Sequence, residues 1–130
     1  MDAFSDGTDE KYERNFLQLH RLLLKSTRVL KAKFDSFVPH TQFKSWLPND
    51  RDLKKAKLTD YQIRLMKRKP DSKEFDISLL ISLLRNFCYT RETNNPLWKE
   101  ESNKNILPSM TCDIASIVRI RNLRNKVCLL

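Results

Sequence analysis

The stretch that decides the fold is residues 71–90, DSKEFDISLLISLLRNFCYT. Its large apolar side chains recur at the three- and four-residue steps of an α-helix: Ile77, Leu80, Ile81, Leu84 and then Phe87 or Cys88. Because this apolar face is broad, we expect the helix to be buried on most sides and to lie at the centre of the core. Ser72 is its predicted start.

Two more long helices are predicted around this one. The first runs from about Asp9 to Phe37 and ends before Pro39, and its apolar residues keep the helical period: Phe16, Leu19, Leu23, Leu30, Phe34 and Phe37. We expect it to pack antiparallel on the 71–90 helix. The last begins at Thr111 or Asp113 and runs to the end of the chain.

The segments between the long helices are less regular. Residues 38–70 are predicted to hold an apolar anchor (Phe43, Trp46 and Leu47) and one or two short helices, with Thr59 as a candidate N-cap. Residues 91–110 form a polar loop that Trp98 and Ile106–Leu107 are expected to fix to the body. Loops of this length inside a compact domain are uncommon and often functional.

Length and composition support one helical domain. The chain has 130 residues, 40% of them hydrophobic, which suffices for a single core. A sandwich or barrel needs many tight turns, yet there is one glycine, Gly7, and five prolines. We therefore predict an all-α bundle of about four to five helices, with residues 1–12 as a flexible tail and 13–130 as the domain.

Charge and cysteine content limit the function classes. The formal net charge of +9 permits binding to phosphate or to an acidic surface, but general solubility explains it equally. The three cysteines form no CxxC pair, so neither a metal nor a cofactor is expected. The N-terminus is too polar for a signal peptide, and no apolar run nears the roughly 20 residues of a membrane span. We expect a cytoplasmic protein without a membrane or small-molecule partner.

The last helix carries the candidate binding residues. At about 100° per residue its core stripe is Ile117, Ile120, Leu123 and Val127, and its far, solvated side is Arg119, Asn122 and Lys126. Arg121, Arg124 and Asn125 form a polar strip beside the core stripe, on the face that also holds Cys128. An arginine pair there can make forked contacts to phosphate or carboxylate. Ordinary solvation with salt bridges is the alternative interpretation of this strip.

Three segments together resemble a known family: NFLQLHRLLLKSTRVLKAKFDSF (15–37), DSKEFDISLLISLLRNFC (71–88) and DIASIVRIRNLRNKV (113–127). They are similar, in the same order, to the HEPN domain found in DAZ-interacting zinc-finger ubiquitin ligases and their invertebrate relatives. The resemblance covers nearly all of residues 14–130. It implies an all-α bundle, usually dimeric and linked to RNA, that normally sits within a larger signalling or ubiquitin-ligase chain.

The resemblance also implies a catalytic motif, which this chain departs from. Active members of the wider class cut RNA without metal, using an arginine, then a polar residue, then a histidine four to six positions on. Arg124 and Asn125 match the first two, but Cys128, Leu129 and Leu130 stand where Tyr, Gly and His are expected. The alternative register, Arg121–Asn122, places Val127 at the histidine position.

The sequence therefore predicts a phosphate holder without a proton shuttle. His20 and His40, the only histidines, are both weak candidates for that role. We expect a non-catalytic HEPN-like interaction module, of the type found in RNA-linked ubiquitin-ligase or innate-immune signalling proteins. Its expected partners are RNA and either a second copy or another helical signalling domain. The interface candidates are Ile120, Val127 and Leu130. The alternative is a metal-independent HEPN endoribonuclease domain truncated at its C-terminus, because a helix that finishes on VCLL has no capping residue.

Overall fold

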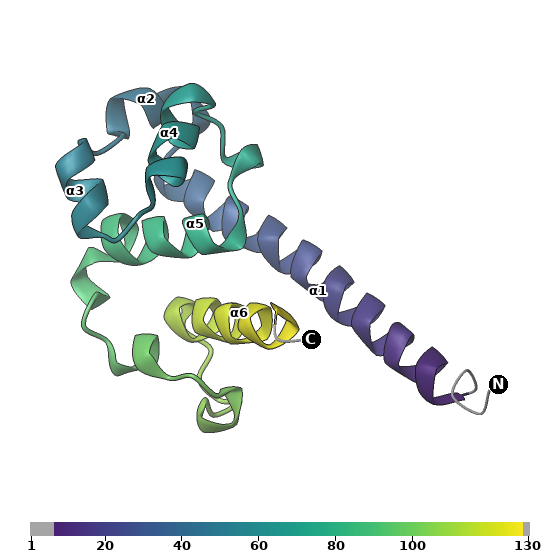
Figure 1. The fold of residues 1–130 in the computed structure, drawn as a ribbon. Coiled ribbons are helices and arrows are strands. Elements are labelled where there is room, and N and C mark those ends of the chain that lie inside the picture. The colour runs from purple at the N-terminus through teal and green to yellow at the C-terminus, as the bar shows by residue number, and fades with distance from the viewer. Residues whose placement is uncertain (1–6, 129–130) are drawn as a thin grey trace.

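The computed structural model describes residues 7–128, and within that range the chain is all-helical, with no strand. The predicted all-α fold is thus confirmed. The α-helices are α1 (Gly7–Phe37), α2 (Phe43–Trp46), α3 (Asp50–Lys55), α4 (Asp60–Arg68), α5 (Ile77–Leu83) and α6 (Asp113–Cys128) (Figure 1). No helix in this range is long and apolar enough to cross a membrane.

Short helical turns connect these elements. They are η1 (His40–Gln42), η2 (Ser72–Glu74), η4 (Thr90–Glu92), η5 (Pro96–Lys99) and η6 (Asn103–Asn105), all of the 3-10 type. The fifth α-helix continues directly into η3 (Leu84–Cys88), a π-helical turn. Such π turns are rare and often occur at functional sites.

The core is built around α5, as its sequence predicts. Leu80 and Leu84 are completely buried, and Ile77 and Ile81 are 8% exposed. The predicted start of this helix was wrong, however. Ser72 belongs to the separate turn η2, and α5 begins at Ile77 because the Asp76 carboxylate accepts a hydrogen bond from the Leu79 amide at 2.8 Å.

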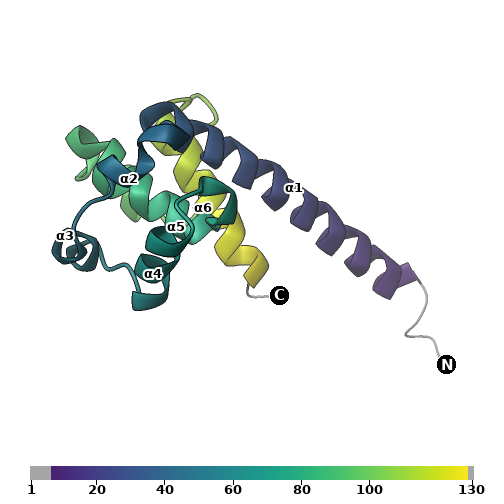
Figure 2. The same ribbon diagram turned by 90° about the horizontal axis from the view of Figure 1, so that it is seen from above.

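Around α5, the C-terminal half of α1 and the first half of α6 complete the core. Leu30 and Phe34 of α1 and Ile114, Ile117 and Val118 of α6 are at most 1% exposed. The two views show α5 running in the same general direction as α1, and α6 running back against both (Figures 1 and 2). The antiparallel arrangement expected for α1 and α5 is thus wrong, because residues 38–76 return the chain before α5 begins.

The N-terminal half of α1 extends away from the rest of the molecule (Figures 1 and 2). Phe16 lies on the same helical face as Leu30 and Phe34, yet its side chain is 41% exposed because the body of the protein ends before it. Phe37, at the other end of the predicted stripe, is 47% exposed and packs edge-on against Tyr89. The helical period of α1 was predicted correctly, but only the middle of its stripe is core.

The segments between the long helices follow the predictions in part. Residues 38–70 contain three short α-helices rather than one or two, because Phe43–Trp46 of the predicted apolar anchor forms α2. Thr59 is the N-cap of α4, in a reciprocal capping box with Gln62. Trp98 and Ile106 are buried and fix the 91–110 loop, whereas Leu107 is 55% exposed. The last helix begins at Asp113, one of the two predicted starts, and the first begins at Gly7, slightly before the expected Asp9.

Candidate functional site

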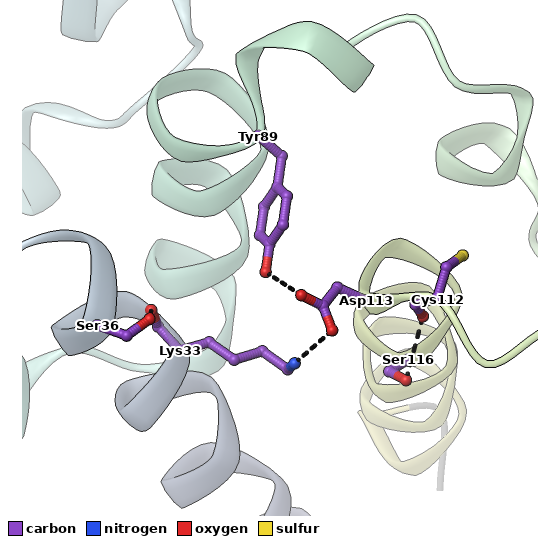
Figure 3. Close-up of polar contacts among 6 residues, drawn as sticks. All are labelled: Lys33, Ser36, Tyr89, Cys112, Asp113 and Ser116. Carbon is purple, nitrogen blue, oxygen red and sulfur yellow. Dashed lines mark hydrogen bonds and ion pairs between the residues drawn. The ribbon is translucent and has the colours of Figure 1, made fainter.

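Two polar contacts at Asp113 position the start of α6 against its neighbours (Figure 3). The carboxylate of Asp113 accepts hydrogen bonds from Lys33 Nζ at 3.0 Å and from Tyr89 Oη at 2.9 Å. These bonds hold the pKa of Asp113 below its usual value, the Lys33 contact contributing most. Burial, and then the bond to Asp113, raise the pKa of Tyr89 above its usual value. Through Asp113 the two contacts join α6 to α1 and to Tyr89, the residue that follows η3.

Farther along α6, Arg121 is held by the backbone of the 91–110 loop. Its guanidinium is partly buried and donates to the carbonyl oxygens of Trp98 and Glu100. Burial lowers the pKa of Arg121, as does the nearby charge of Arg85, while Glu101 acts in the opposite direction. Since guanidinium stays charged in proteins, Arg121 is a fixed positive charge that also clamps the loop.

Asn122 is the clearest correction to the predicted layout of α6. The helical periodicity predicted that Asn122 lies on the solvated side of α6, but the residue is only 8% exposed. Its Nδ2 donates to the Glu100 carbonyl and to Asn103 Oδ1, both at 3.0 Å. Arg119, predicted on the same side, is partly buried and donates to the Leu107 carbonyl at 2.7 Å. The loop therefore covers the side of α6 that periodicity assigned to solvent.

The predicted strip of Arg121, Arg124 and Asn125 lines one wall of a pocket of about 300 Å³. Within the strip, the Arg124 guanidinium donates to Asn125 Oδ1 at 3.3 Å. The rest of the lining comes from α5 and η3, from Trp98 of η5, and from the turn between α3 and α4. The pocket is thus assembled from four segments that are distant in the sequence.

Four positive side chains line this pocket, which we call the basic pocket: Lys57, Arg85, Arg121 and Arg124. None of the lining residues that the structure describes is acidic. The acid that opposes the pKa shift of Arg121, Glu101, lines an adjacent hollow instead. Converging cations without a lining carboxylate create a positive potential that a low-dielectric wall strengthens. The arrangement can hold an anion.

Arg85 and Lys57 were missed by the sequence reasoning. Arg85 lies in the π-helical turn with its guanidinium 5.3 Å from the ring centroid of Trp98, a cation–π contact. In the sequence it looks like the polar end of an apolar helix. No residue pattern predicts a π-helical turn. The sequence around Arg85 therefore gives no indication that its side chain lines the same pocket as the α6 strip.

Lys57 is the only non-glycine residue with positive φ in the described range, at 65°. It follows the end of α3 in a Schellman motif, in which the amide of Leu58 donates to the Leu53 carbonyl at 3.2 Å and the amide of Lys57 to the Lys54 carbonyl at 2.9 Å. Glycine usually occupies this position, because a side chain is sterically disfavoured there. The sequence lacks the glycine that usually marks this motif. The remaining indication is the pair of apolar residues Leu53 and Leu58, which often accompanies it.

The other predicted site residues lie elsewhere. Ile120 is half-buried and packs against the core, and Val127 is half-buried near the end of α6. Leu130 lies outside the described residues. Neither histidine lines the basic pocket: the His20 ring stacks on Phe16 in α1, and His40 Nδ1 is 4.0 Å from Asp71 Oδ1. Among the side chains that the structure describes, no three His, Cys, Asp or Glu residues lie together in a group that could hold a metal ion.

Comparison with known proteins gives one result. A family model described as DZIP3/hRUL138-like HEPN matches residues 17–129, which includes α1 from Leu17, α5 and all of α6. No curated protein and no solved structure gives a significant match.

Proposed function

The chain belongs to the DZIP3/hRUL138-like HEPN family, and we propose that it is a non-catalytic HEPN module that binds RNA. The observation that carries the proposal is the basic pocket, in which four cations line one hollow and none of the described lining residues is acidic. Arginine side chains favour phosphate because their planar donors match its oxygens. Arg124 and Asn125, at the positions that match the family motif, lie on the wall of this pocket.

The same geometry supports binding without cleavage. Acid–base catalysis requires a titratable group within hydrogen-bond reach of the ribose hydroxyl, and histidine is the usual choice. His20 and His40 are both absent from the lining of the basic pocket. Arginine can bind the phosphate but cannot exchange a proton near neutral pH. RNA that binds here therefore stays intact.

The test is binding and cleavage in one experiment. The chain is mixed with labelled single-stranded RNA in the presence of EDTA. Fluorescence anisotropy measures binding, and a gel shows whether the RNA stays intact. We expect binding that weakens steeply as salt rises, and no cleavage. Arg124→Gln should weaken binding by about tenfold or more. Arg64→Gln removes the same charge from exposed α4, outside the basic pocket, and should have a smaller effect.

Two results would contradict the proposal. Equal losses in Arg124→Gln and Arg64→Gln would mean that RNA responds only to net charge. Cleavage by the original chain that disappears in Arg124→Gln would instead favour the endoribonuclease interpretation.

We further propose that the module self-associates through α1 rather than through Ile120 and Val127. The protruding half of α1 exposes several large apolar side chains, namely Phe16 41%, Leu17 52%, Leu22 48% and Leu24 53%. Leu17 and Leu24 are seven residues apart and so share one face of the helix. Exposed apolar faces of this kind mark interaction sites. Residues 7–14 of this helix include three acidic and two basic residues, whereas residues 21–33 include five basic and no acidic residues. Two copies of α1 packed antiparallel therefore place opposite charges side by side.

A further inference from the structure

We propose that the basic pocket takes the terminal phosphate monoester of an RNA strand, with Lys57 and Arg85 as further binding residues. This inference rests on the proposed RNA binding and names the part of the RNA that the site recognises. Neither residue belongs to the predicted strip on α6. Both line the pocket from other elements, Lys57 from the α3–α4 turn and Arg85 from η3.

The charge of the pocket favours a monoester over an internal phosphodiester. An internal phosphate carries one negative charge, whereas a terminal monoester carries about 1.5 to 2 at neutral pH. The pocket is lined by four positive side chains and by no described acidic residue. The single negative charge of an internal phosphate would neutralise only part of this positive charge. Arg121 is already bonded to two backbone carbonyls, so it contributes mainly as a fixed charge. Lys57, Arg85 and Arg124 come from three separate elements and line the same pocket.

The pocket also has room for a phosphate group. Its volume is about 300 Å³, and its lining comes from α5, η3, α6, the α3–α4 turn and Trp98. The lining includes the neutral amides of Asn86 and Asn125, and side-chain amides can donate to phosphate oxygens.

The backbone at Lys57 supports a binding role. Lysine occupies the left-handed position of the Schellman motif, where glycine avoids the steric cost. Residues held in disfavoured backbone regions concentrate at ligand-binding sites. The substitution Lys57→Gly relieves the strain while it removes the charge. It is therefore a variant that keeps the fold and still tests the site.

The experiment compares three forms of one short RNA: with a 5′-monophosphate, with a 3′-monophosphate, and with hydroxyls at both ends. We expect one phosphorylated form to bind about tenfold tighter than the hydroxyl form. That gain should disappear in Lys57→Gly while its melting temperature stays equal or rises, and it should persist in Arg64→Gln. Inorganic phosphate should remove the extra affinity of the phosphorylated RNA but should not weaken binding of the hydroxyl form.

The outcomes separate this inference from the proposed function. Equal binding of all three RNAs overturns the terminal-phosphate inference and leaves RNA binding intact, whereas no binding of any form overturns both. Adenosine 5′-monophosphate tests whether a free nucleotide is enough. If it binds the chain as tightly as the phosphorylated RNA does, the assignment to a strand end is overturned. A phosphoserine peptide that competes as well as the phosphorylated RNA overturns the assignment to RNA.

Discussion

Asn122 donates a hydrogen bond from its side-chain amide to the carbonyl oxygen of Glu100 at 3.0 Å, and so joins α6 to a loop that lies 22 residues earlier. The same carbonyl accepts from Arg121 at 2.8 Å. Two neighbouring residues of α6 therefore share one anchor point on the loop. This anchor fixes η5, and with it Trp98, at the edge of the basic pocket.

Replacing Asn122 with Ala should lower the free energy of unfolding by about 1–3 kcal/mol, because the Glu100 carbonyl and Asn103 Oδ1 each lose the hydrogen bond that buried Asn122 donates. Chemical denaturation measures this. Lys126→Ala, on the same predicted side but exposed, is the control and should change stability by less than about 0.5 kcal/mol. Equal effects in the two variants would mean that the loop does not cover Asn122.

Leu80 and Phe16, which were both predicted to lie in the contact between α1 and α5, should differ sharply in their contribution to stability. Leu80→Ala should cost about 2–5 kcal/mol, because the side chain is fully buried and leaves a cavity. Phe16→Ala should cost less than about 0.5 kcal/mol in dilute solution, because the residue lies beyond the body. Thermal unfolding of both variants decides this. A large loss in Phe16→Ala would show that α1 packs against the body along its whole length.

Lys57→Gly should leave stability unchanged or raise it by up to about 1 kcal/mol, since the left-handed conformation is unfavourable for a residue with a side chain. Urea denaturation measures the change. Lys54→Gly is the matched control, because it places glycine inside α3 and should destabilise by roughly 0.5–1 kcal/mol. A loss of equal size in both would indicate that Lys57 is not strained.

Asp113→Asn should weaken the acid dependence of stability. The Asp113 pKa is lowered in the folded protein, so its contribution is present above the ordinary value of 3.8 and is lost as the pH falls through the folded-state value. The original chain should therefore exceed the variant in stability near neutral pH, and the difference should shrink below about pH 4. Denaturation at a series of pH values checks this. A pH-independent difference would exclude the ion pair with Lys33 as its source.

Self-association should depend on the protruding half of α1. Leu17→Glu places a charge in the proposed contact, and we expect sedimentation to show a shift from dimer to monomer at about ten micromolar. Leu107→Glu is the control, since Leu107 is equally exposed but lies on the 91–110 loop. A monomer for the original chain, or the same shift in both variants, would argue against the α1 contact. Capture of another helical domain by a monomeric chain would favour the alternative partner.

The sequence by itself determined which segments form the long helices, because helical periodicity is a local pattern. The buried face of α5, Thr59 as the N-cap of α4 and a start of α6 at Thr111 or Asp113 all follow from spacing within a few residues. The family resemblance, carried by short segments in a fixed order, was equally accessible and is confirmed. The chain also supplied Arg121, Arg124 and Asn125 as one strip, and the structure brings all three to one pocket.

Only the tertiary structure decided what surrounds each helical face. Periodicity states which residues share a face, but not how far a neighbouring element extends along it, so Phe16 was assigned to the core although the body ends before it. It also cannot state that a polar loop lies over a helix, so Asn122 was assigned to solvent. Lys57 and Arg85 meet the α6 strip through contacts that span tens of residues. Such contacts depend on the packing of whole elements, and no local pattern encodes them.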